Sequence, residues 1–250
     1  MKIWFLIIGW LGVIADFPGA YAKDLVPSQT PMPIKTLPDI SLGSLQSPIT
    51  VVMYFAPTCN HCAQYEQNIL PDIQKDFINA GKVHFIMRLL PFHRLDYFVA
   101  KLVWSRGEEK IFQNVQLFLS HQKDWLEPAL EDIKERRKVL QETVKLAAEE
   151  TRTTAQALMD ELNITLEDED AFLKIFALKN GFTVEEIHQA QQENTNFEEA
   201  LTANHLQAAK DFGKSLDYVP AFMVNGTPKK GWVRPKDLIK AFKKNANKKI

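Results

Sequence analysis

The chain has 250 residues, of which 46% are hydrophobic and 24% are charged, and its formal net charge is −1. This balance indicates an ordinary globular protein that is long enough to bury a core. The charge balance gives no sign of a nucleic-acid-binding face, and two cysteines are too few for a disulfide-stapled miniature scaffold.

The first 22 residues have the pattern of a secretory signal peptide. Lys2 precedes the apolar run Ile3–Ile14, and a small-x-small cleavage site (Ala-Tyr-Ala) follows at 20–22. Asp16 interrupts the apolar stretch before it reaches the roughly 18 residues that a membrane span needs, so the pattern favours a cleaved leader over an uncleaved anchor. We therefore expect an exported protein in an oxidising compartment, where disulfides persist.

Residues 23–48 are expected to form an extended N-terminal arm, because prolines stand among Ser, Thr and Gly there. The run 49–55 (ITVVMYF) is apolar on both faces and too short for a buried helix, which predicts a central strand. Apolar residues then recur at helical spacing, with Pro71 expected to kink the helix and Gly81 to end it. A second apolar strand at 83–90 completes a βαβ unit with a parallel strand pair.

The strand signal returns near the C-terminus. Residues 221–224 (AFMV) and 231–233 (GWV) read as two strands, joined through Asn225-Gly226 and a few extra residues. A closing helix is expected from Pro235, because proline is tolerated in a first helical turn.

The stretch 95–216 shows helical spacing and no convincing strand. We therefore expect one α/β domain, made of residues 49–94 and 217–250, with an inserted helical domain at 95–216 between its βαβ half and its C-terminal ββα half.

One helix of the inserted domain is expected along 126–147, where apolar residues keep close to a three-four spacing. Thr153 with Gln156 is expected to cap the next helix. The charged faces of 126–147 favour a solvated helix over a coiled-coil partner site. Its heptads are too few to predict an oligomer, so a monomer is expected.

The only two cysteines stand at the predicted junction of the first strand and its helix, in the order Cys59-Asn60-His61-Cys62. A cysteine in a first helical turn faces unpaired backbone N–H groups and the positive end of the macrodipole, which stabilise its thiolate. In such motifs the thiol pKa is as low as about 3.5 to 7.5, against about 8.5 for a free thiol. Because this favours the reduced form, the disulfide becomes an oxidant. We expect Cys59 to be the exposed nucleophile, Cys62 the buried resolving thiol, and His61 a further stabiliser of the thiolate.

Three other uses of the pair fit the sequence less well. A structural disulfide gains stability by closing a long loop, and two intervening residues close almost none. A zinc site needs three or four ligands, and His84 and His93 are distant in sequence, so no metal is expected. Ala63, not histidine, follows Cys62, which argues against covalent haem attachment. No cofactor is expected beyond the redox-active disulfide itself.

Several segments of the sequence resemble a known family. Residues 55–63 (FAPTCNHCA), 81–83 (GKV) and 218–226 (YVPAFMVNG) are similar to the DsbA-like branch of the thioredoxin-fold disulfide oxidoreductases. The resemblance runs from about residue 47 to the end, apart from a stretch at roughly 128–170. It implies a thioredoxin-like fold with a large helical insertion.

The resemblance also implies roles for residues outside the motif. Pro220 matches the cis proline that faces the cysteine pair, and Val219 matches the residue whose backbone pairs with substrate peptide. Glu66 matches an acidic residue beneath the active site that is associated with proton transfer to the buried thiol, the alternative being a surface glutamate. Asn60 stands where the family commonly has proline, and we expect Asn60, Val219 and Pro220 to bind substrate.

We therefore expect a periplasmic thiol:disulfide oxidoreductase that donates its disulfide to unfolded, newly exported proteins containing cysteine. The resemblance implies that a DsbB-like membrane quinone reductase recycles it. Related isomerases usually carry an N-terminal dimerisation module, for which 23–48 is too short, so isomerase or reductase is the alternative. The helical block suggests another alternative, a chaperone-like protein-binding module with secondary redox activity.

Overall fold

The computed structural model describes residues 37–126 and 133–246. The predicted signal peptide, most of the predicted arm and a part of the helix predicted at 126–147 lie outside these residues. Within the described ranges, no helix is both long enough and apolar enough to cross a membrane.

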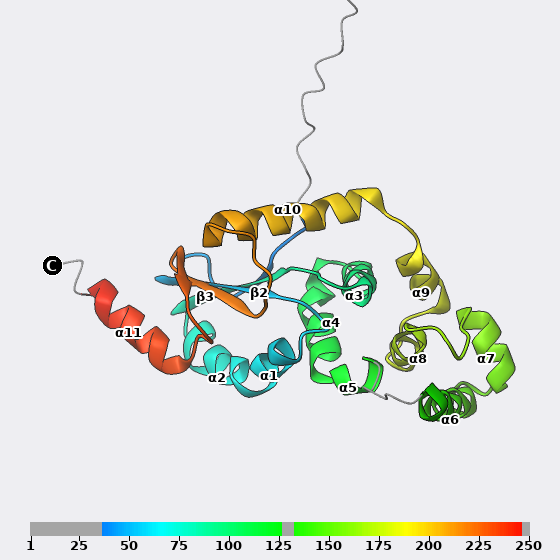
Figure 1. Ribbon diagram of the computed structural model, residues 1–250. Coiled ribbons are helices and arrows are strands. Elements are labelled where there is room, and N and C mark those ends of the chain that lie inside the picture. The colour runs from blue at the N-terminus through cyan, green and yellow to red at the C-terminus, as the bar shows by residue number, and fades with distance from the viewer. Residues whose placement is uncertain (1–36, 127–132, 247–250) are drawn as a thin grey trace, which may run out of the picture. The chain divides into compact units, whose positions relative to one another are not determined.

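The described residues contain a five-stranded sheet with the strand order β1-β3-β2-β4-β5 (Figure 1). Its strands are β1 (Ile40–Leu42), β2 (Ile49–Phe55), β3 (Val83–Leu89), β4 (Ala221–Val224) and β5 (Thr227–Lys229). β2 and β3 run parallel, as predicted, and the other neighbouring strands are antiparallel. β2 is therefore the central strand, which accounts for its apolar side chains on both faces.

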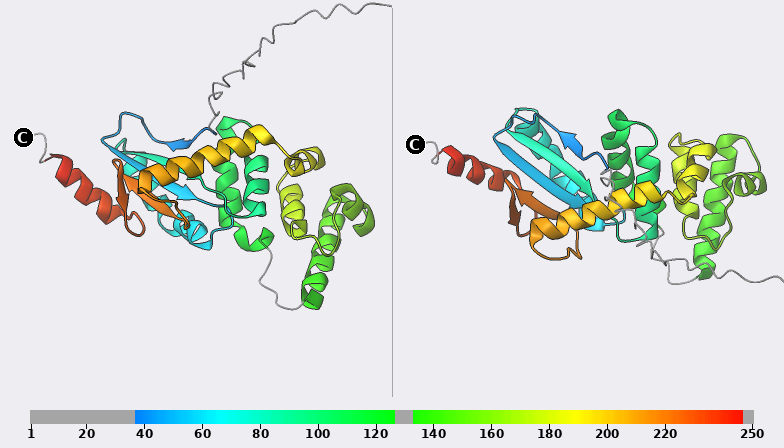
Figure 2. Two further views of the ribbon diagram at one scale, coloured as in Figure 1. Left: turned by 45° about the horizontal axis from the view of Figure 1, so that its top comes forward. Right: turned by 90° about the horizontal axis from the view of Figure 1, so that it is seen from above.

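Alternate residues of β2 face two different apolar clusters. The odd-numbered residues of Val51–Phe55 pack in the cluster that includes α1 (Asn60–Asn68), whereas Val52 and Tyr54 pack in the cluster that includes α10 (Thr195–Phe212). α1 and α10 accordingly cover opposite faces of the sheet (Figure 1). Figure 2 shows that α10 reaches from the helical insertion back to the sheet.

The helix after β2 breaks next to the predicted proline. Ile69, with φ −123°, separates α1 from α2 (Leu70–Ile73), and Pro71 occupies the first turn of α2. Proline is tolerated there because first-turn N–H groups have no partner within the helix. A π-helical turn, η1 (Gln74–Ile78), follows, and Gly81 at φ 67° lies in the turn before β3.

The two edge strands differ from what the sequence predicts. β1 lies within the range 23–48, expected to be an arm, and pairs with β3. The strand predicted at 231–233 is wrong, because Asn225 and Gly226 (φ 48° and 72°) make a two-residue turn and β5 follows at once. Such a turn matches the twist of the flanking strands. Pro228 is accommodated because β5 is an edge strand.

The described part of the chain has eight helices between β3 and β4. They are α3 (Arg94–Trp104), α4 (Glu108–Ser120), α5 (Gln122–Trp125), α6 (Ile133–Thr151), α7 (Ala155–Leu162), α8 (Ala171–Lys179), α9 (Val184–Gln191) and α10. The predicted α/β fold with a large helical insertion is confirmed.

Two details of the insertion correct the prediction. The helix expected over 126–147 is present from Ile133 onward, but Leu126 has an extended backbone. The cap of α7 is Thr154, not Thr153, because the Thr154 hydroxyl accepts a hydrogen bond from the backbone N–H of Ala157 (3.1 Å). The two adjacent threonines are indistinguishable by type, and only the helix start decides between them.

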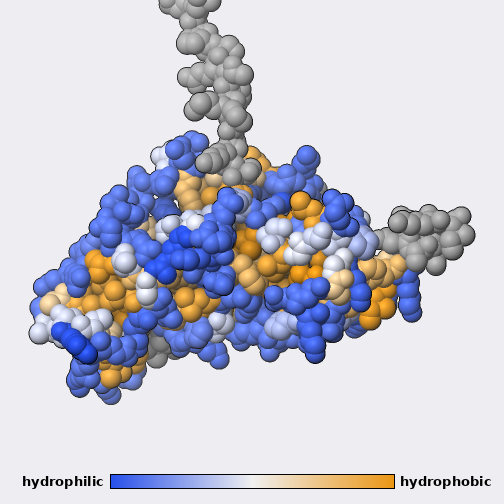
Figure 3. Space-filling view, turned by 180° about the vertical axis from the view of Figure 1, so that it is seen from behind, coloured by the Kyte–Doolittle hydropathy of each residue, from blue (hydrophilic) through white to orange (hydrophobic). Residues whose placement is uncertain are grey.

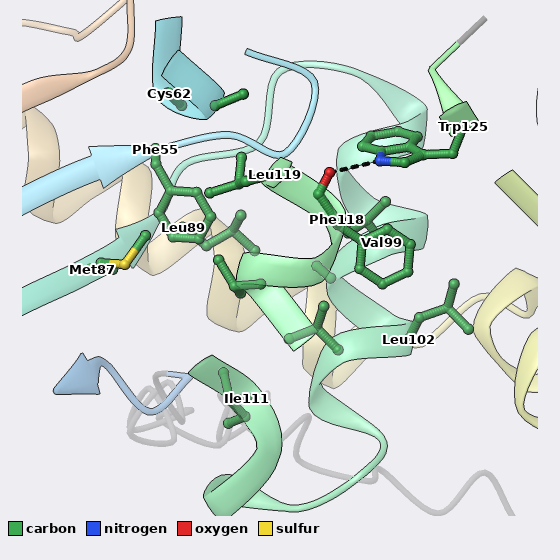
Figure 4. Close-up of a cluster of buried hydrophobic side chains, with 14 of the residues drawn as sticks. Phe55, Cys62, Met87, Leu89, Val99, Leu102, Ile111, Phe118, Leu119 and Trp125 are labelled. Atoms are coloured by element: carbon green, nitrogen blue, oxygen red, sulfur yellow. Dashed lines mark hydrogen bonds between the residues drawn. The ribbon is translucent and has the colours of Figure 1, made fainter. Parts of the chain in front are cut away.

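An apolar cluster joins the sheet to the insertion (Figure 4). Phe55 and Leu89 end β2 and β3, and they meet Val99 of α3 and Phe118 of α4. Trp125 is fully buried and packs edge-on against Phe118 at a ring distance of 5.8 Å. Its Nε1–H donates to the Phe118 carbonyl oxygen (2.7 Å). The insertion therefore shares its core with the carboxyl ends of these strands.

The closing helix α11 (Pro235–Ala246) starts at the predicted proline. Leu238 is fully buried, and Phe242 stacks on Phe77 at a ring distance of 6.3 Å, so α11 is attached to the α2–η1 side of the sheet domain.

Figure 3 shows that hydrophilic side chains divide the apolar surface of the rear face into separate patches.

Candidate active site

Cys59 and Cys62 lie at the start of α1, a few residues beyond the end of β2. Cys59 is the N-cap residue and has an extended backbone (φ −76°, ψ 109°), and both cysteines are free thiols. The backbone N–H of Cys62 donates to Cys59 Sγ (3.1 Å), and the Cys59 thiol donates to the carbonyl oxygen of Val219 (3.3 Å). The Cys59 sulfur thus takes the place that a side-chain oxygen usually holds at a helix N-terminus.

The surroundings of Cys59 favour its thiolate. Its pKa is lowered chiefly by a hydrogen bond from the Cys62 thiol, and further by the backbone N–H groups of Cys62 and His61. Burial and the negative charge of Asp96 oppose this lowering without cancelling it. The two backbone donors belong to the N-terminal turn of α1, whose N–H groups have no helical partner.

The surroundings of Cys62 have the opposite effect. Its side chain is fully buried in the apolar cluster of Figure 4. Burial raises the pKa of the Cys62 thiol well above its usual range, and the Cys59 sulfur and the Asp96 charge raise it further. One motif therefore holds a sulfur that ionises readily beside a sulfur that keeps its proton.

The Val219–Pro220 segment lies beside Cys59. The peptide bond between these residues is cis, and the Val219 carbonyl accepts the hydrogen bond from the Cys59 thiol. Val219 is half-buried and packs against both apolar clusters of the sheet, while Pro220 directly precedes β4. Val219 is thus brought to Cys59, as the resemblance implies. Substrate binding by Val219 and Pro220 stays a prediction.

The two residues between the cysteines are exposed. The His61 ring packs edge-on against Trp232 at a ring distance of 6.5 Å, and Asn60 Oδ1 accepts from Gln64 Nε2 (3.4 Å). The backbone N–H of His61 lowers the pKa of Cys59. Thiolate stabilisation by the His61 ring and substrate contact by Asn60 remain predictions.

Glu66 lies one helical turn beyond Cys62 and is buried, with only 5% of its surface exposed. The alternative of a surface glutamate is therefore wrong. Gln116 Nε2 of α4 donates to Glu66 Oε1 (2.9 Å). Burial raises the pKa of the Glu66 carboxyl, against the opposing effects of Gln116 and His121. A buried carboxyl with a raised pKa suits a proton carrier, and this role for Glu66 stays a prediction.

Sequence reasoning missed two buried polar side chains that hold the loop before Cys59. Asp96 Oδ1 accepts from the backbone N–H of Thr58 (2.8 Å), and Gln122 Nε2 donates to the carbonyl oxygen of Pro57 (2.6 Å). Both come from the helical insertion. The only local signal is Asp96 in the first turn of α3, where an acidic residue is common and gives no hint of a distant partner.

His84 and His93, the two histidines considered as metal ligands, have other roles in the structure. His84 on β3 shares a hydrogen bond with the Ser41 hydroxyl (2.6 Å), and His93 is the N-cap residue of α3. Across the described ranges, no three His, Cys, Asp or Glu side chains are grouped as metal ligands would be.

Comparison with known proteins finds a matching family and several relatives of this chain. The family model described as thioredoxin matches residues 35–244. A Rickettsia conorii protein, provisionally named a protein-disulfide oxidoreductase, is 34% identical over 86 residues, which is 34% of this chain and 31% of the relative. The chain thus spans about a third of the length of the curated relatives that it matches first.

Two solved structures are similar in fold. The alpha-DsbA1 of Wolbachia pipientis matches with a TM-score of 0.57 and 19% identity, over 85% of this chain and 93% of that chain. A protein-disulfide isomerase from Novosphingobium aromaticivorans matches with a TM-score of 0.60 and 18% identity, over 84% and 100% of the respective chains. These matches confirm the predicted thioredoxin-like fold.

Proposed function

The chain belongs to the thioredoxin family, and on this premise we propose that it is a protein-disulfide oxidoreductase that donates its Cys59–Cys62 disulfide to client proteins. The contrast between the two sulfurs supports this proposal most directly. The pKa of Cys59 is lowered at the helix end, and the pKa of buried Cys62 is raised. A dithiol with a stabilised thiolate resists reoxidation, so its disulfide is an oxidant.

The first step of the reaction forms a mixed disulfide. A client thiolate attacks Cys59 Sγ, the bond between Cys59 Sγ and Cys62 Sγ breaks, and Cys62 leaves with the electron pair and takes up a proton. Attack at Cys59 is favoured because Cys59 is only half-buried whereas Cys62 is fully buried. Glu66, one turn along α1, is proposed to pass the proton to Cys62.

The second step releases the oxidised client. A second client thiolate attacks the client sulfur of the mixed disulfide, the new client disulfide forms, and Cys59 leaves as a thiolate. The client has lost two electrons, and the cysteine pair has gained them. The lowered pKa makes Cys59 a good leaving group at neutral pH.

Export and recycling complete the proposal. The leader-like pattern of residues 1–22 supports secretion to the periplasm, where unfolded proteins that carry free cysteines would be the clients. Each turnover leaves a dithiol that needs an electron acceptor. A DsbB-like membrane quinone reductase is the acceptor that the family resemblance suggests.

Three assays separate the proposed oxidase from other oxidoreductases. The oxidised protein should restore activity to reduced, unfolded ribonuclease in stoichiometric amounts without another oxidant. It should be less effective with scrambled ribonuclease, which reports isomerase activity, and in insulin reduction, which reports reductase activity. A protein that refolds scrambled ribonuclease but cannot oxidise reduced ribonuclease would contradict the proposal.

A Cys59→Ser, Cys62→Ser double variant tests the protein-binding alternative. It should lose the ability to oxidise ribonuclease completely, because no disulfide remains to donate. If the double variant still suppressed aggregation of unfolded clients as well as the wild type, protein binding by the helical insertion would be the better description.

A further inference from the structure

The loop that leads into the redox motif is held from outside the sheet domain. Its Pro57 carbonyl accepts from Gln122 of α5, and its Thr58 N–H donates to Asp96 of α3. Thr58 is bonded directly to Cys59, so these two hydrogen bonds fix the chain on the N-terminal side of the nucleophile. Both holding side chains belong to the helical insertion.

Asp96 differs from Gln122 in carrying a charge. Its side chain is fully buried, and Oδ2 accepts the backbone N–H groups of Phe92 and His93 (both 3.0 Å) while Oδ1 accepts that of Thr58. In the described part of the chain, no Lys, Arg or His side chain lies within ion-pair distance of it.

We propose that Asp96 is a positioning residue that also sets the redox balance of the cysteine pair. Its hydrogen bond to Thr58 holds the loop, and its negative charge, which has no ion-pair partner among the described residues, opposes the thiolate that forms on Cys59. The effect is to make the disulfide a milder oxidant than the helix end alone would make it.

The position of Asp96 supports the electrostatic part of the proposal, because its carboxylate binds the residue directly before Cys59. Burial raises the pKa of both thiols, and the charge of Asp96 adds to this effect, whereas hydrogen bonds from Cys62 and His61 lower the pKa of Cys59. At the effective dielectric of a protein interior, a charge is felt over several ångströms, so contact with the sulfur is not required.

The test is the equilibrium with glutathione, and it rests on the proposed function. The Cys59–Cys62 disulfide and two glutathione molecules give the dithiol and one glutathione disulfide. Asp96→Asn removes the charge and keeps one acceptor oxygen. We expect the equilibrium to move toward the dithiol by about tenfold, which corresponds to a potential about 30 mV more oxidising.

Two control variants separate charge from positioning. Gln122→Ala removes the neutral hydrogen bond to the same loop and should lower stability without a comparable shift of the equilibrium. Glu186→Gln neutralises another helix-capping carboxylate, which accepts from the Thr183 N–H (2.7 Å) on α9, and should leave the equilibrium unchanged. An unchanged equilibrium in Asp96→Asn, or an equal shift in Gln122→Ala, would overturn the proposal.

A second measurement needs no Asp96 variant and covers the case in which Asp96→Asn does not fold. The carboxyl ¹³C signal of Asp96 in the reduced wild-type protein should shift as Cys59 ionises, and this shift should vanish in Cys59→Ser. A signal that does not follow the ionisation would overturn the proposal. A wild-type disulfide that does not exchange with glutathione at all would instead count against the proposed function.

Discussion

Cys59 and Cys62 have the same side chain but opposite environments, and this difference can be measured directly. In the reduced protein, iodoacetamide should modify Cys59 and spare Cys62, because Cys62 is fully buried and its pKa is raised. The midpoint of the pH–rate profile for Cys59 should lie below the value of about 8.5 for a free thiol. Peptide mass mapping gives both rates, and equal modification of the two cysteines would be inconsistent with the site.

Glu66 gives a second residue-scale prediction. Burial raises its pKa in the folded state, so its contribution to stability is greatest below the unfolded-state pKa of about 4.3 and is lost as pH rises through the folded value. The stability of Glu66→Gln relative to the wild type should therefore be higher at pH 7 than at pH 4.

Urea unfolding at these two pH values checks this, with Glu142→Gln as the control. The Glu142 side chain is 61% exposed, so its neutralisation should change stability by less than about 0.5 kcal/mol at either pH. The prediction fails if Glu66→Gln and Glu142→Gln respond to pH in the same way.

The residues of the site were predictable where the signal is local or where the family resemblance supplies it. Cys59 caps α1, and Cys62 and Glu66 lie within it, so spacing and resemblance were enough to select them, while resemblance alone selected Val219 and Pro220. Asp96 and Gln122 meet the redox loop across 38 and 65 residues of sequence. Nothing in the spacing of a single sequence records a hydrogen bond between such distant segments.

At the scale of elements, β1 depends on the glycine that follows it. Gly43 has φ +86°, and a Cβ at this position would lie 2.6 Å from the backbone carbonyl oxygen of Val83, the first residue of β3. Gly43→Ala should therefore destabilise the protein by about 2 kcal/mol or more, because both backbone strain and a clash with a backbone atom oppose it.

Gly213 is the matched control for this prediction. It ends α10 at φ +68°, but a Cβ there would meet no atom within 4 Å. Gly213→Ala should cost only about 1 kcal/mol, the penalty of the left-handed backbone alone. Denaturant midpoints compare the two variants, and equal costs would show that the contact with β3 is not tight.

The elements that the sequence predicts well are those with long, regular patterns. β2 has its predicted bounds, 49–55, because a seven-residue apolar strand buried on both faces is specified by its own composition. β1 and β5 have three residues each, and their stability comes from pairing with β3 and β4. Such short edge strands are specified by their partners, which explains why the strand predicted at 231–233 is wrong.

At the scale of the whole molecule, the redox state of one residue pair should change the stability of the fold. One apolar cluster includes side chains of the sheet and of the helical insertion, so the oxidised and reduced proteins should each unfold in a single transition. Neither sulfur titrates in the disulfide. The pH dependence of the difference in stability between the two forms therefore reports the ionisation of Cys59 and Cys62.

The sign of the pH dependence follows from the two thiol pKa values. The lowered pKa of Cys59 stabilises the reduced fold most fully above the unfolded-state value of about 8.5, and this stabilisation is lost as pH falls through the folded value. The raised pKa of Cys62 acts the other way, and its contribution is lost above about pH 8.5. The stability of the reduced protein relative to the oxidised protein should therefore be greater at pH 8 than at pH 5, and should decline at higher pH.

The most direct test of the disulfide-donor account is urea unfolding of the purified protein at pH 7, once with Cys59 and Cys62 reduced and once with them joined. The account predicts a higher urea midpoint for the reduced protein, because the thiolate at the start of α1 is favoured by the fold and the crosslink is not. A reduced protein that unfolds at the same urea concentration as the oxidised protein, or at a lower one, would contradict it.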